Sequence, residues 1–412
     1  MKVWLKLLLA ALGGMLLGFL APEENPAFLE ALRLLERSAI QLGRYTVPPV
    51  LFFSLTIGFY ELRKDGKLLA LAGRALAIMA GCALLVILAG LAVTLAVPTG
   101  RIPLAVAEPG EAVSLELTQA ALDLFPSNLF SALVSGGAYL LPLGIAAYLL
   151  SIGLSYDRNH TKPVIALLDS LSRIFYHIMS FISELLAPVL ILLSAYWAIR
   201  YRAVVRMDLC QPLILQLGVI CVLLGFGLLP CCLYALKPKA KANPWAAVYG
   251  SLGPALGAFF SQDLNFTLPL LLRHGKENLG IRRRANAFSA GLFAVFGRAG
   301  SAMTAAVAFI AILRSYSSLE PRFEDILAVG GRAFLLSFLL FRHPGNGACA
   351  ALTVLCSWFG RGFEAGYNIL KPLAFYLTAT GTVLDALINA YASYALGKLS
   401  GLQRDQPIRR FI

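Results

Sequence analysis

Long uninterrupted apolar runs constrain this chain more than any other feature. Four of them cover residues 3–21, 75–97, 213–236 and 285–313. About 20 apolar residues in a helix cross a bilayer core of roughly 30 Å, and because lipid offers the backbone no hydrogen-bond partner, such runs must be helical. The runs lack the alternation and short spacing of an outer-membrane barrel. The sequence therefore predicts an all-α, multi-pass membrane protein.

Composition agrees with this interpretation. The 412 residues are 58% hydrophobic and 14% charged, whereas a soluble chain is about 45–50% apolar and about 25% charged. Lys2 and Lys6 lie at the start of the first apolar run, as basic residues do in a signal peptide. However, no small-residue cleavage site follows the run. We interpret residues 2–21 as the first spanning helix.

Eight segments are long enough to cross, and two further segments are interrupted. We expect spanning helices near residues 2–21, 40–60, 67–98, 124–154, 164–199, 210–236, 284–313 and 366–397. The segment 245–275 is broken by polar residues at 261–265 and by Pro269, and the segment 325–360 is broken at 342–347. Each half is too short to cross alone. Since irregular backbone at membrane depth must be covered by protein or line a cavity, we predict two re-entrant helical hairpins; two kinked crossings are the alternative.

The charge distribution indicates orientation rather than nucleic-acid binding. The formal net charge is +13, but the basic residues fall in short loops, while acidic residues fall in alternate loops at 23–24 and 108–123. By the positive-inside rule we expect a multi-pass protein of the inner (plasma) membrane with both termini in the cytoplasm. The cytoplasmic loops would be those near 61–67, 157–162, 237–243 and 273–284. Arg200, Arg202 and Arg206 break the pattern, with snorkelling as the one explanation that the sequence offers.

Cysteine and histidine patterns predict neither a structural metal nor a cofactor. The seven cysteines are odd in number and fall mostly inside apolar runs, where they act as small hydrophobic residues. No CxxC or Cys/His ligand spacing occurs, and the four histidines are far apart in sequence.

Five short motifs occur in a fixed order along nearly the whole chain. They are VPPVLFFSL at 47–55, PSNLFSAL at 126–133, LAP at 186–188, TLP at 267–269 and PGNG at 344–347. Together with the two interrupted segments, this order resembles the dicarboxylate/amino acid:cation symporters, also described as sodium:dicarboxylate symporters and glutamate transporter homologues. The chain is identified as a divergent member of that family.

The resemblance implies a glutamate-transporter-homologue fold with eight transmembrane helices and two re-entrant hairpins. Residues 1–240 would form mainly the scaffold and trimerisation helices 1–6, with helices 3 and 6 joining the transport part. Residues 241–400 would form the transport core, from hairpin 1 through helix 7 and hairpin 2 to helix 8. Residues 401–412 would be a cytoplasmic tail. The family also implies a homotrimer in membrane lipid, an elevator motion and a small anionic substrate, with no nucleic-acid partner.

The family's functional residues transfer poorly. Its serine-rich first hairpin tip is replaced here by 263–266 (DLNF), and its Asn-Met-Asp-Gly-Thr of helix 7 by 297–301 (GRAGS). Of five polar positions in helix 8, Asp385 matches and Asn389 stands where the family has threonine. A sodium site needs several converging oxygen ligands, so the losses predict altered or absent sodium coupling. The coupling ion, sodium or proton, stays open.

Arg298 is the most informative single residue. A lone arginine in an apolar helix costs about 2.5–3.5 kcal/mol on insertion scales and marks a bundle interior or cavity. Asp385 and Asp263 are its candidate partners. Arg298 either pairs with Asp385 and mimics a bound cation, or it meets an anionic substrate; a purely structural pair is the third interpretation. The candidate substrate-binding residues are Asp263, Asn265, Thr267, Arg298, Ser301, Arg342, Pro344, Gly345, Gly347, Asp385 and Asn389, with Arg342 a second carboxylate-gripping candidate.

These observations bear on three candidate functions. The first is a symporter-like secondary active transporter of a small organic anion or amino acid such as glutamate, aspartate or a dicarboxylate. The alternative is an anion-conducting or non-transporting relative that keeps the scaffold. An enzyme is rejected because the carboxylates Asp169, Glu184 and Asp263 are scattered singly instead of forming a catalytic cluster.

Overall fold

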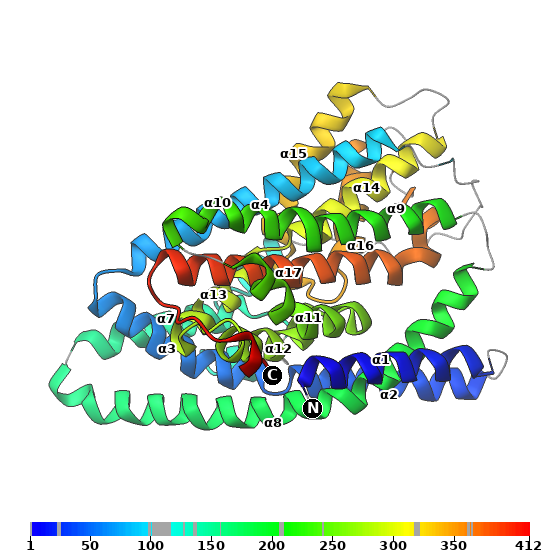
Figure 1. Ribbon diagram of the computed structural model, residues 1–412. Coiled ribbons are helices and arrows are strands. Elements are labelled where there is room, and N and C mark those ends of the chain that lie inside the picture. Colours follow the sequence, from blue (N-terminus) through cyan, green and yellow to red (C-terminus); the bar gives the residue numbers. More distant parts are fainter. Residues whose placement is uncertain are drawn as a thin grey trace.

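The computed structural model is almost entirely helical in the part of the chain that it describes (Figure 1). It describes residues 2–22, 26–97, 100, 117–126, 128–134, 138–156, 158–205, 210–240, 243–316, 322–360, 363 and 366–412. Within these ranges the sole β-type pairing is an isolated bridge between Ile281 and Gln403. The acidic residues expected at 23–24 and 108–116 lie outside the described residues, as do Ser127 of the second motif and Arg206. The predicted all-helical class is confirmed for the described part.

The described residues of the first half of the chain form a series of helices, most of them long. The elements are α1 (Val3–Leu20), α2 (Pro26–Arg44), α3 (Val47–Lys64), α4 (Leu68–Ala96), α5 (Leu117–Leu122), α6 (Ser131–Val134), α7 (Leu141–Tyr156), α8 (Arg158–Val205), α9 (Gln211–Val222), the π-helical η1 (Leu223–Leu228) and α10 (Leu229–Ala240). Helix α1 packs along α8 (Figure 1). Gly14 and Gly18 make this approach possible, because a Cβ on either would come within 2.3 Å of α8 atoms.

The second half contains two helix pairs, one apolar run that a short break divides into two helices, and one long helix near the C-terminus. The elements are α11 (Pro244–Ser261), α12 (Leu264–Glu277), α13 (Arg283–Phe296), α14 (Ala299–Tyr316), α15 (Phe323–Leu339), the 3₁₀ turn η2 (Leu340–Arg342), α16 (Gly347–Phe359), the 3₁₀ segment η3 (Gly366–Leu373), α17 (Ala374–Leu399) and η4 (Ile408–Arg410). Helices α11 and α12 pack together as the first helical hairpin, whose tip is at residues 261–264. Helices α15 and α16 are also in contact and form the second hairpin, whose tip is at residues 342–347. The interruptions expected within 245–275 and 325–360 are therefore present.

Three predicted spans differ from the observed helices. The segment 40–60 is divided, because α2 ends at Arg44 and α3 begins at Val47 with a proline in its first turn. Among the described residues of 124–154 the one long helix is α7, which has 16 residues and carries Pro142 near its start. The run 284–313 is two helices, α13 and α14, separated at Gly297 and Arg298. A hydropathy window does not detect such a short break.

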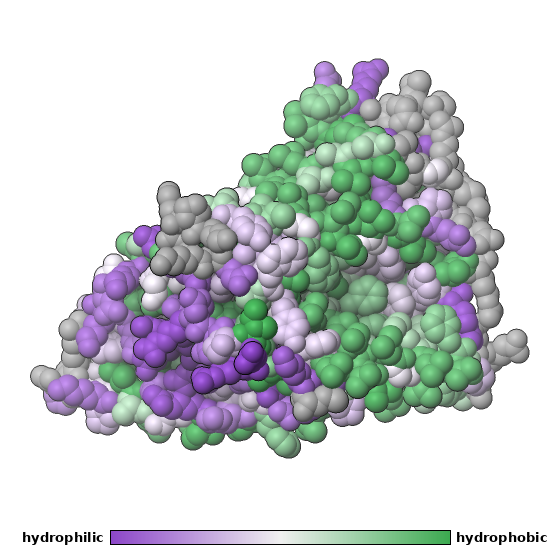
Figure 2. Space-filling view, in the orientation of Figure 1, coloured by the Kyte–Doolittle hydropathy of each residue, from purple (hydrophilic) through white to green (hydrophobic). Residues whose placement is uncertain are grey.

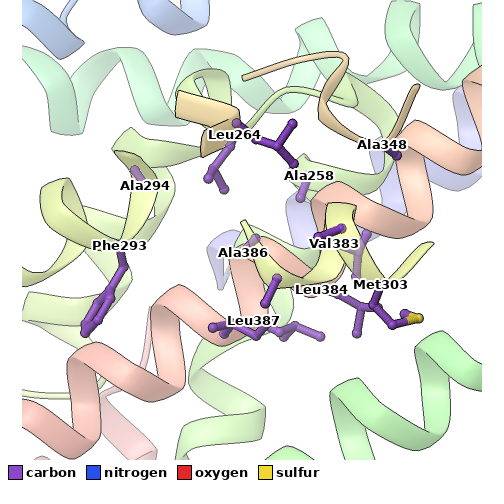
Figure 3. Packing of buried hydrophobic residues seen from close by; sticks show 14 of the residues in the cluster. Ala258, Leu264, Phe293, Ala294, Met303, Ala348, Val383, Leu384, Ala386 and Leu387 are labelled. Atoms are coloured by element: carbon purple, nitrogen blue, oxygen red, sulfur yellow. The ribbon is translucent and has the colours of Figure 1, made fainter. Parts of the chain in front are cut away.

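Burial separates the central helices from the peripheral ones. Among the residues that the structure describes, six helical segments are long and apolar enough to cross a membrane. In the most apolar windows of 283–315 and 366–399, 94% of the residues are buried, against 33% in α1 and α4. Around Met303 of α14, the close view shows Val383 and Leu384 of α17 (Figure 3). The peripheral helices expose leucines, such as Leu16 and Leu88, as expected for surfaces that face lipid.

The segments expected in the cytoplasm gather at one end of the molecule. Lys2 Nζ lies 3.0 Å from the Tyr249 hydroxyl, and the Tyr249 ring stacks on Phe411. At the same end Arg284 pairs with Glu61 of α3. Hydrophilic side chains gather at the lower left in Figure 2, over this end of the molecule, and hydrophobic side chains cover much of the rest of the face shown. The grouping agrees with the charge pattern, while the side of the membrane on which it lies stays a prediction.

Candidate functional site

A buried ion pair lies at the break between α13 and α14. Arg298 Nε is 3.3 Å from Asp385 Oδ2, and both side chains are at most 1% exposed. The Nε–H makes no aligned hydrogen bond among the described residues, so the contact is an ion pair rather than a charge-assisted hydrogen bond. Of the two partners suggested by the sequence, Asp385 is the one that Arg298 meets.

Asp385 also caps the N-terminus of α14. Its Oδ1 accepts the backbone N–H groups of Gly300 (2.7 Å) and Ser301 (3.1 Å), and its Oδ2 accepts the Ser301 hydroxyl at 2.6 Å. A carboxylate at this position satisfies amides that the helix leaves unpaired and interacts favourably with the helix dipole. Asp385 is therefore held by three hydrogen-bond donors in addition to the arginine.

The other end of the Arg298 guanidinium holds the tip of the second hairpin. Its Nη2 donates to the carbonyl oxygens of His343 (2.9 Å) and Pro344 (3.1 Å). The Pro344 carbonyl also accepts the backbone N–H of Leu264 at 3.1 Å, at the tip of the first hairpin. One carbonyl thus joins both hairpin tips to Arg298, at the start of α14.

Close contacts at the second tip depend on glycine. A Cβ on Gly347 would lie 2.8 Å from Arg298 Nη2 and 3.1 Å from Ser301 Oγ. A Cβ on Gly345 would lie 2.6 Å from Asp263 Oδ2. Only glycine leaves room for the arginine and the aspartate at these two points.

Asp263 ties the first hairpin tip to α2. It is the N-cap of α12, where its Oδ1 accepts the Phe266 N–H at 2.7 Å. Arg44, the last residue of α2, donates its Nε–H to the same oxygen at 3.2 Å, and its Nη2 pairs with Oδ2. Asp263 is only 1% exposed. It therefore pairs with Arg44 and not with Arg298.

A cavity of about 490 Å³ lies between the two hairpin tips, α2 and the end of α8. Its charged lining residues are Glu36, Arg44, Arg200, Asp263 and Arg342. Such a volume is typical of small-molecule sites, and its charged groups are predominantly cationic.

The three arginines of this cavity differ in their partners. Arg44 is neutralised by Asp263, and Arg342 lies 3.1 Å from Asp123 Oδ2. The guanidinium of Arg200 instead lies over the ring of Phe375, 4.8 Å from its centroid. No carboxylate of the described residues pairs with Arg200 within ion-pair distance. Arg200 is therefore the cation of this cavity that is best placed to meet an added anion.

The structure brings together most of the predicted site residues. Arg298, Ser301, Asp385, Pro344 and Gly347 contact one another around the ion pair. Asp263, Arg342, Pro344 and Gly345 line the adjacent cavity.

Three predicted residues have other contacts. Thr267 donates to the carbonyl of Asp263 one helical turn back, and Asn265 donates to the carbonyl of Ala138. Asn389 donates to Ala290 of α13 at 2.9 Å. None of the three is among the residues that line the large cavity.

Sequence reasoning missed Arg44, Arg200 and Glu36 as members of the site. The signal for Arg200 was present, since its place in the charge pattern was anomalous. Arg202 has a different role, because it donates to the Ala21 carbonyl at 2.9 Å and to that of Phe19, at the end of α1. Snorkelling is therefore not needed to explain these two arginines.

Apolar helices of spanning length, paired helices with touching tips and a charged cavity beside those tips define a multi-pass membrane transporter. The sequence matches the model of the sodium:dicarboxylate symporter family over residues 3–399, nearly the whole chain, and the chain belongs to that family. The family in general carries out sodium-coupled transport of dicarboxylates and amino acids, and its members are transporters rather than enzymes. No individual curated protein matched the sequence.

Proposed function

We propose that this chain is a secondary active transporter of a small organic anion or amino acid, such as glutamate, aspartate or a dicarboxylate. In this proposal the Arg298 guanidinium replaces the coupled sodium ion. The observation that supports it is the set of oxygens around the guanidinium: the Asp385 carboxylate and the carbonyls of His343 and Pro344. A carboxylate and unwound carbonyls are the ligands that broken transporter helices offer to a cation.

A tethered cation changes the energetics of coupling. A bound sodium ion would have to displace the guanidinium or share its oxygens, and a second positive charge a few ångströms away in a buried site is unfavourable. The same guanidinium neutralises Asp385 at all times. The hairpin tips therefore close without a sodium ion, and sodium does not drive the transport cycle.

Substrate would bind in the cavity beside the tips. Its position between α2, α8 and the hairpins resembles that of a site between a scaffold and a moving part, which is the arrangement that an elevator motion requires. Among the described residues Arg200 has no carboxylate within ion-pair distance, and guanidinium grips a carboxylate in a planar, bidentate manner. Glu36, on the same cavity wall, is placed to meet an amino group.

Uptake into liposomes tests the proposal. The purified protein is reconstituted, and accumulation of labelled glutamate, aspartate and succinate is followed with an inward sodium gradient, an inward proton gradient or neither. We expect accumulation of at least one substrate that a sodium gradient does not increase. Accumulation that requires sodium would contradict the replacement of sodium by Arg298.

A variant makes the cation argument specific. In Arg298→Met the Asp385 carboxylate and the two carbonyls lose their cation, so we expect sodium chloride, but not choline chloride, to raise the thermal unfolding temperature of the variant. The wild type should show no difference between the two salts. Equal behaviour of variant and wild type would contradict the idea that the guanidinium occupies a cation site.

An anion-conducting or non-transporting relative is the second candidate. The observation that favours it is that Arg298 contacts both Asp385 and the second hairpin tip, while Arg200 has no ion-pair partner among the described residues that line the cavity. Anion current without accumulation of any substrate would favour this alternative over the transporter.

A further inference from the structure

A second large cavity lies at the other end of the molecule from the hairpin tips. Its volume is about 480 Å³, and it lies between α3, α8, α12 and the start of α13, beside Leu402 of the C-terminal segment. Five cationic side chains line it: Arg173, Lys276, Arg282, Arg283 and Arg284. Two carboxylates, Glu61 and Asp65, line it as well. The cavity therefore carries an excess of positive charge.

The carboxylates near this cavity do not balance its cations. Asp169 alone serves three arginines: Arg283 at 2.7 Å, Arg284 at 2.9 Å and Arg173 at 3.0 Å. Glu61 pairs with Arg284, which already shares Asp169.

Glu277, the neighbour of Lys276 in the sequence, is also engaged. Glu277 accepts a hydrogen bond from the Tyr176 hydroxyl at 3.2 Å and lies 3.6 Å from Arg273. The charge of Glu277 is thus shared with a cation that does not line the cavity.

Lys276 and Arg282 have no carboxylate partner within ion-pair distance among the described residues. The Lys276 ammonium lies over the ring of Tyr176, 3.8 Å from its centroid. Burial lowers the pKa of Lys276, which lies outside the six spanning segments, and the charges of Arg283 and Arg173 act in the same direction against the opposing effect of Glu277. A half-buried ammonium in a positive field gains from an added anion.

The start of α13 faces the same space. Arg282 is its N-cap and provides no side-chain cap, and the residues of its first turn line the cavity. Backbone N–H groups at a helix start, combined with arginines and a lysine, are the donors that phosphate oxygens prefer. Because the arginines and the lysine come from several elements and line one cavity, the site is suited to a group with several acceptor oxygens.

The surface beside the cavity is apolar. On α8, Ile174, Ile178 and Phe181 are exposed close to Arg173, at 53%, 40% and 67%. An acyl chain can lie along these side chains while its headgroup enters the cavity, as at other basic sites at the ends of membrane helices. The same donors can bind free phosphate.

We propose that this cavity binds a phosphate group, carried by an anionic phospholipid or by free inorganic phosphate. The bound phosphate links α3 and α8 on one side to α12 and α13 on the other. Because the site involves neither the ion pair nor the cavity at the hairpin tips, it is independent of the proposed transport function.

Binding to two defined probes tests this proposal. The first probe is inorganic phosphate added to the protein in neutral detergent at low ionic strength, where screening is weak. The second is a nanodisc of pure phosphatidylcholine compared with one containing phosphatidylglycerol. The readout in both is the thermal unfolding temperature. We expect at least one of the two anionic conditions to raise it: phosphate alone identifies free phosphate as the ligand, and phosphatidylglycerol identifies lipid.

The variants Lys276→Gln and Arg282→Gln locate the effect. Neither side chain has an ion pair in the described part of the chain, so neither substitution leaves a carboxylate without its partner; Lys276→Gln also removes the contact with the Tyr176 ring. Each should weaken the response by about tenfold in ligand concentration, as expected for one lost hydrogen bond to a charged group. The matched control is Lys67→Gln, an exposed lysine at the same end that does not line the cavity.

Two results would overturn the proposal. One is a wild type whose unfolding temperature responds to neither phosphate nor phosphatidylglycerol. The other is an equal loss of response in Lys67→Gln and in the two cavity variants, since this would show a general effect of positive charge rather than a site.

Discussion

At the scale of single residues, the pair of Arg298 and Asp385 decides the chemistry of the site. Both side chains are at most 1% exposed, so neither charge is in contact with bulk water. Each depends on the other and on the surrounding donors and carbonyls. Removing one partner of such a pair leaves an uncompensated buried charge, which costs about 3–5 kcal/mol.

A double-mutant cycle measures this dependence. We expect Arg298→Met and Asp385→Asn each to destabilise the protein, with Asp385→Asn the more severe because it also weakens the cap of α14. The double variant should be more stable than the sum of the single effects predicts, by about 1–3 kcal/mol. Thermal unfolding in detergent gives the four values. Additive effects would contradict a direct interaction.

Asp263 combines two roles that substitution can separate. Asn at this position keeps an oxygen for the Phe266 N–H but removes the charge that pairs with Arg44, whereas Ala removes both. Loss of an N-cap costs about 0.5–2 kcal/mol. We therefore expect Asp263→Ala to be less stable than Asp263→Asn by about that amount, measured by thermal unfolding. Equal stability of the two variants would show that capping contributes nothing here.

Sequence reasoning reached some of these residues and not others for a physical reason. A lone charge in an apolar helix must find a partner, so the pairing of Arg298 with an aspartate was predictable. Which aspartate it meets depends on tertiary packing, and Asp263 in fact meets Arg44 of α2. The place of Arg200 beside the hairpin tips likewise depends on how α8 lies against the second half of the chain.

At the scale of elements, the hairpin tips depend on small residues and shared backbone contacts. The carbonyl of Pro344 accepts from both Arg298 and Leu264, so the two tips and the start of α14 form one hydrogen-bonded unit. A side chain at Gly347 would contact Arg298 Nη2 at 2.8 Å and displace it.

The variant Gly347→Ala tests this close fit. We expect it to lower the unfolding temperature and to reduce any uptake, because the second tip cannot keep its contacts with the guanidinium. The matched control is Gly331→Ala in α15 of the same hairpin, where an added Cβ meets nothing within 4 Å and alanine favours the helix by about 0.5–1 kcal/mol. A Gly347→Ala variant as stable as Gly331→Ala would contradict the importance of the fit.

Element boundaries were predictable where a turn residue or a polar cluster marks them. The interruption around 261–265 is such a case. The break at Gly297 lay inside an apolar run, where hydropathy is nearly constant and one glycine beside one arginine is the only signal. The capping contacts from Asp385 that begin α14 come from a helix about 85 residues later, and no local pattern contains them.

At the scale of the whole molecule, the burial of α13, α14 and α17 is the main feature. Helices α14 and α17 are apolar over most of their length because protein surrounds them, whereas α1 and α4 are apolar because they combine protein contacts with exposed leucines. Sequence alone cannot separate the two cases, since lipid and protein interiors select the same residue types.

Orientation in the membrane yields the last prediction. Lys67 is the N-cap of α4, and Val97 is the C-cap at the other end of that helix. Arg409 lies in the C-terminal segment, whose Phe411 stacks on Tyr249. Arg322 precedes α15, after the end of α14, where Arg314 donates to the Thr94 carbonyl near the far end of α4. Lys67 and Arg409 should therefore lie on one side of the membrane, and Arg322 on the other.

Single cysteines at these three exposed positions test the orientation in a Cys231→Ser background, since Cys231 is the exposed native cysteine among the described residues. A membrane-impermeant maleimide added to right-side-out vesicles should label Arg322→Cys alone. With inside-out vesicles it should label Lys67→Cys and Arg409→Cys, because basic segments stay in the cytoplasm. Labelling of Lys67→Cys and Arg409→Cys from opposite sides would contradict the arrangement in which both lie at one end of the molecule.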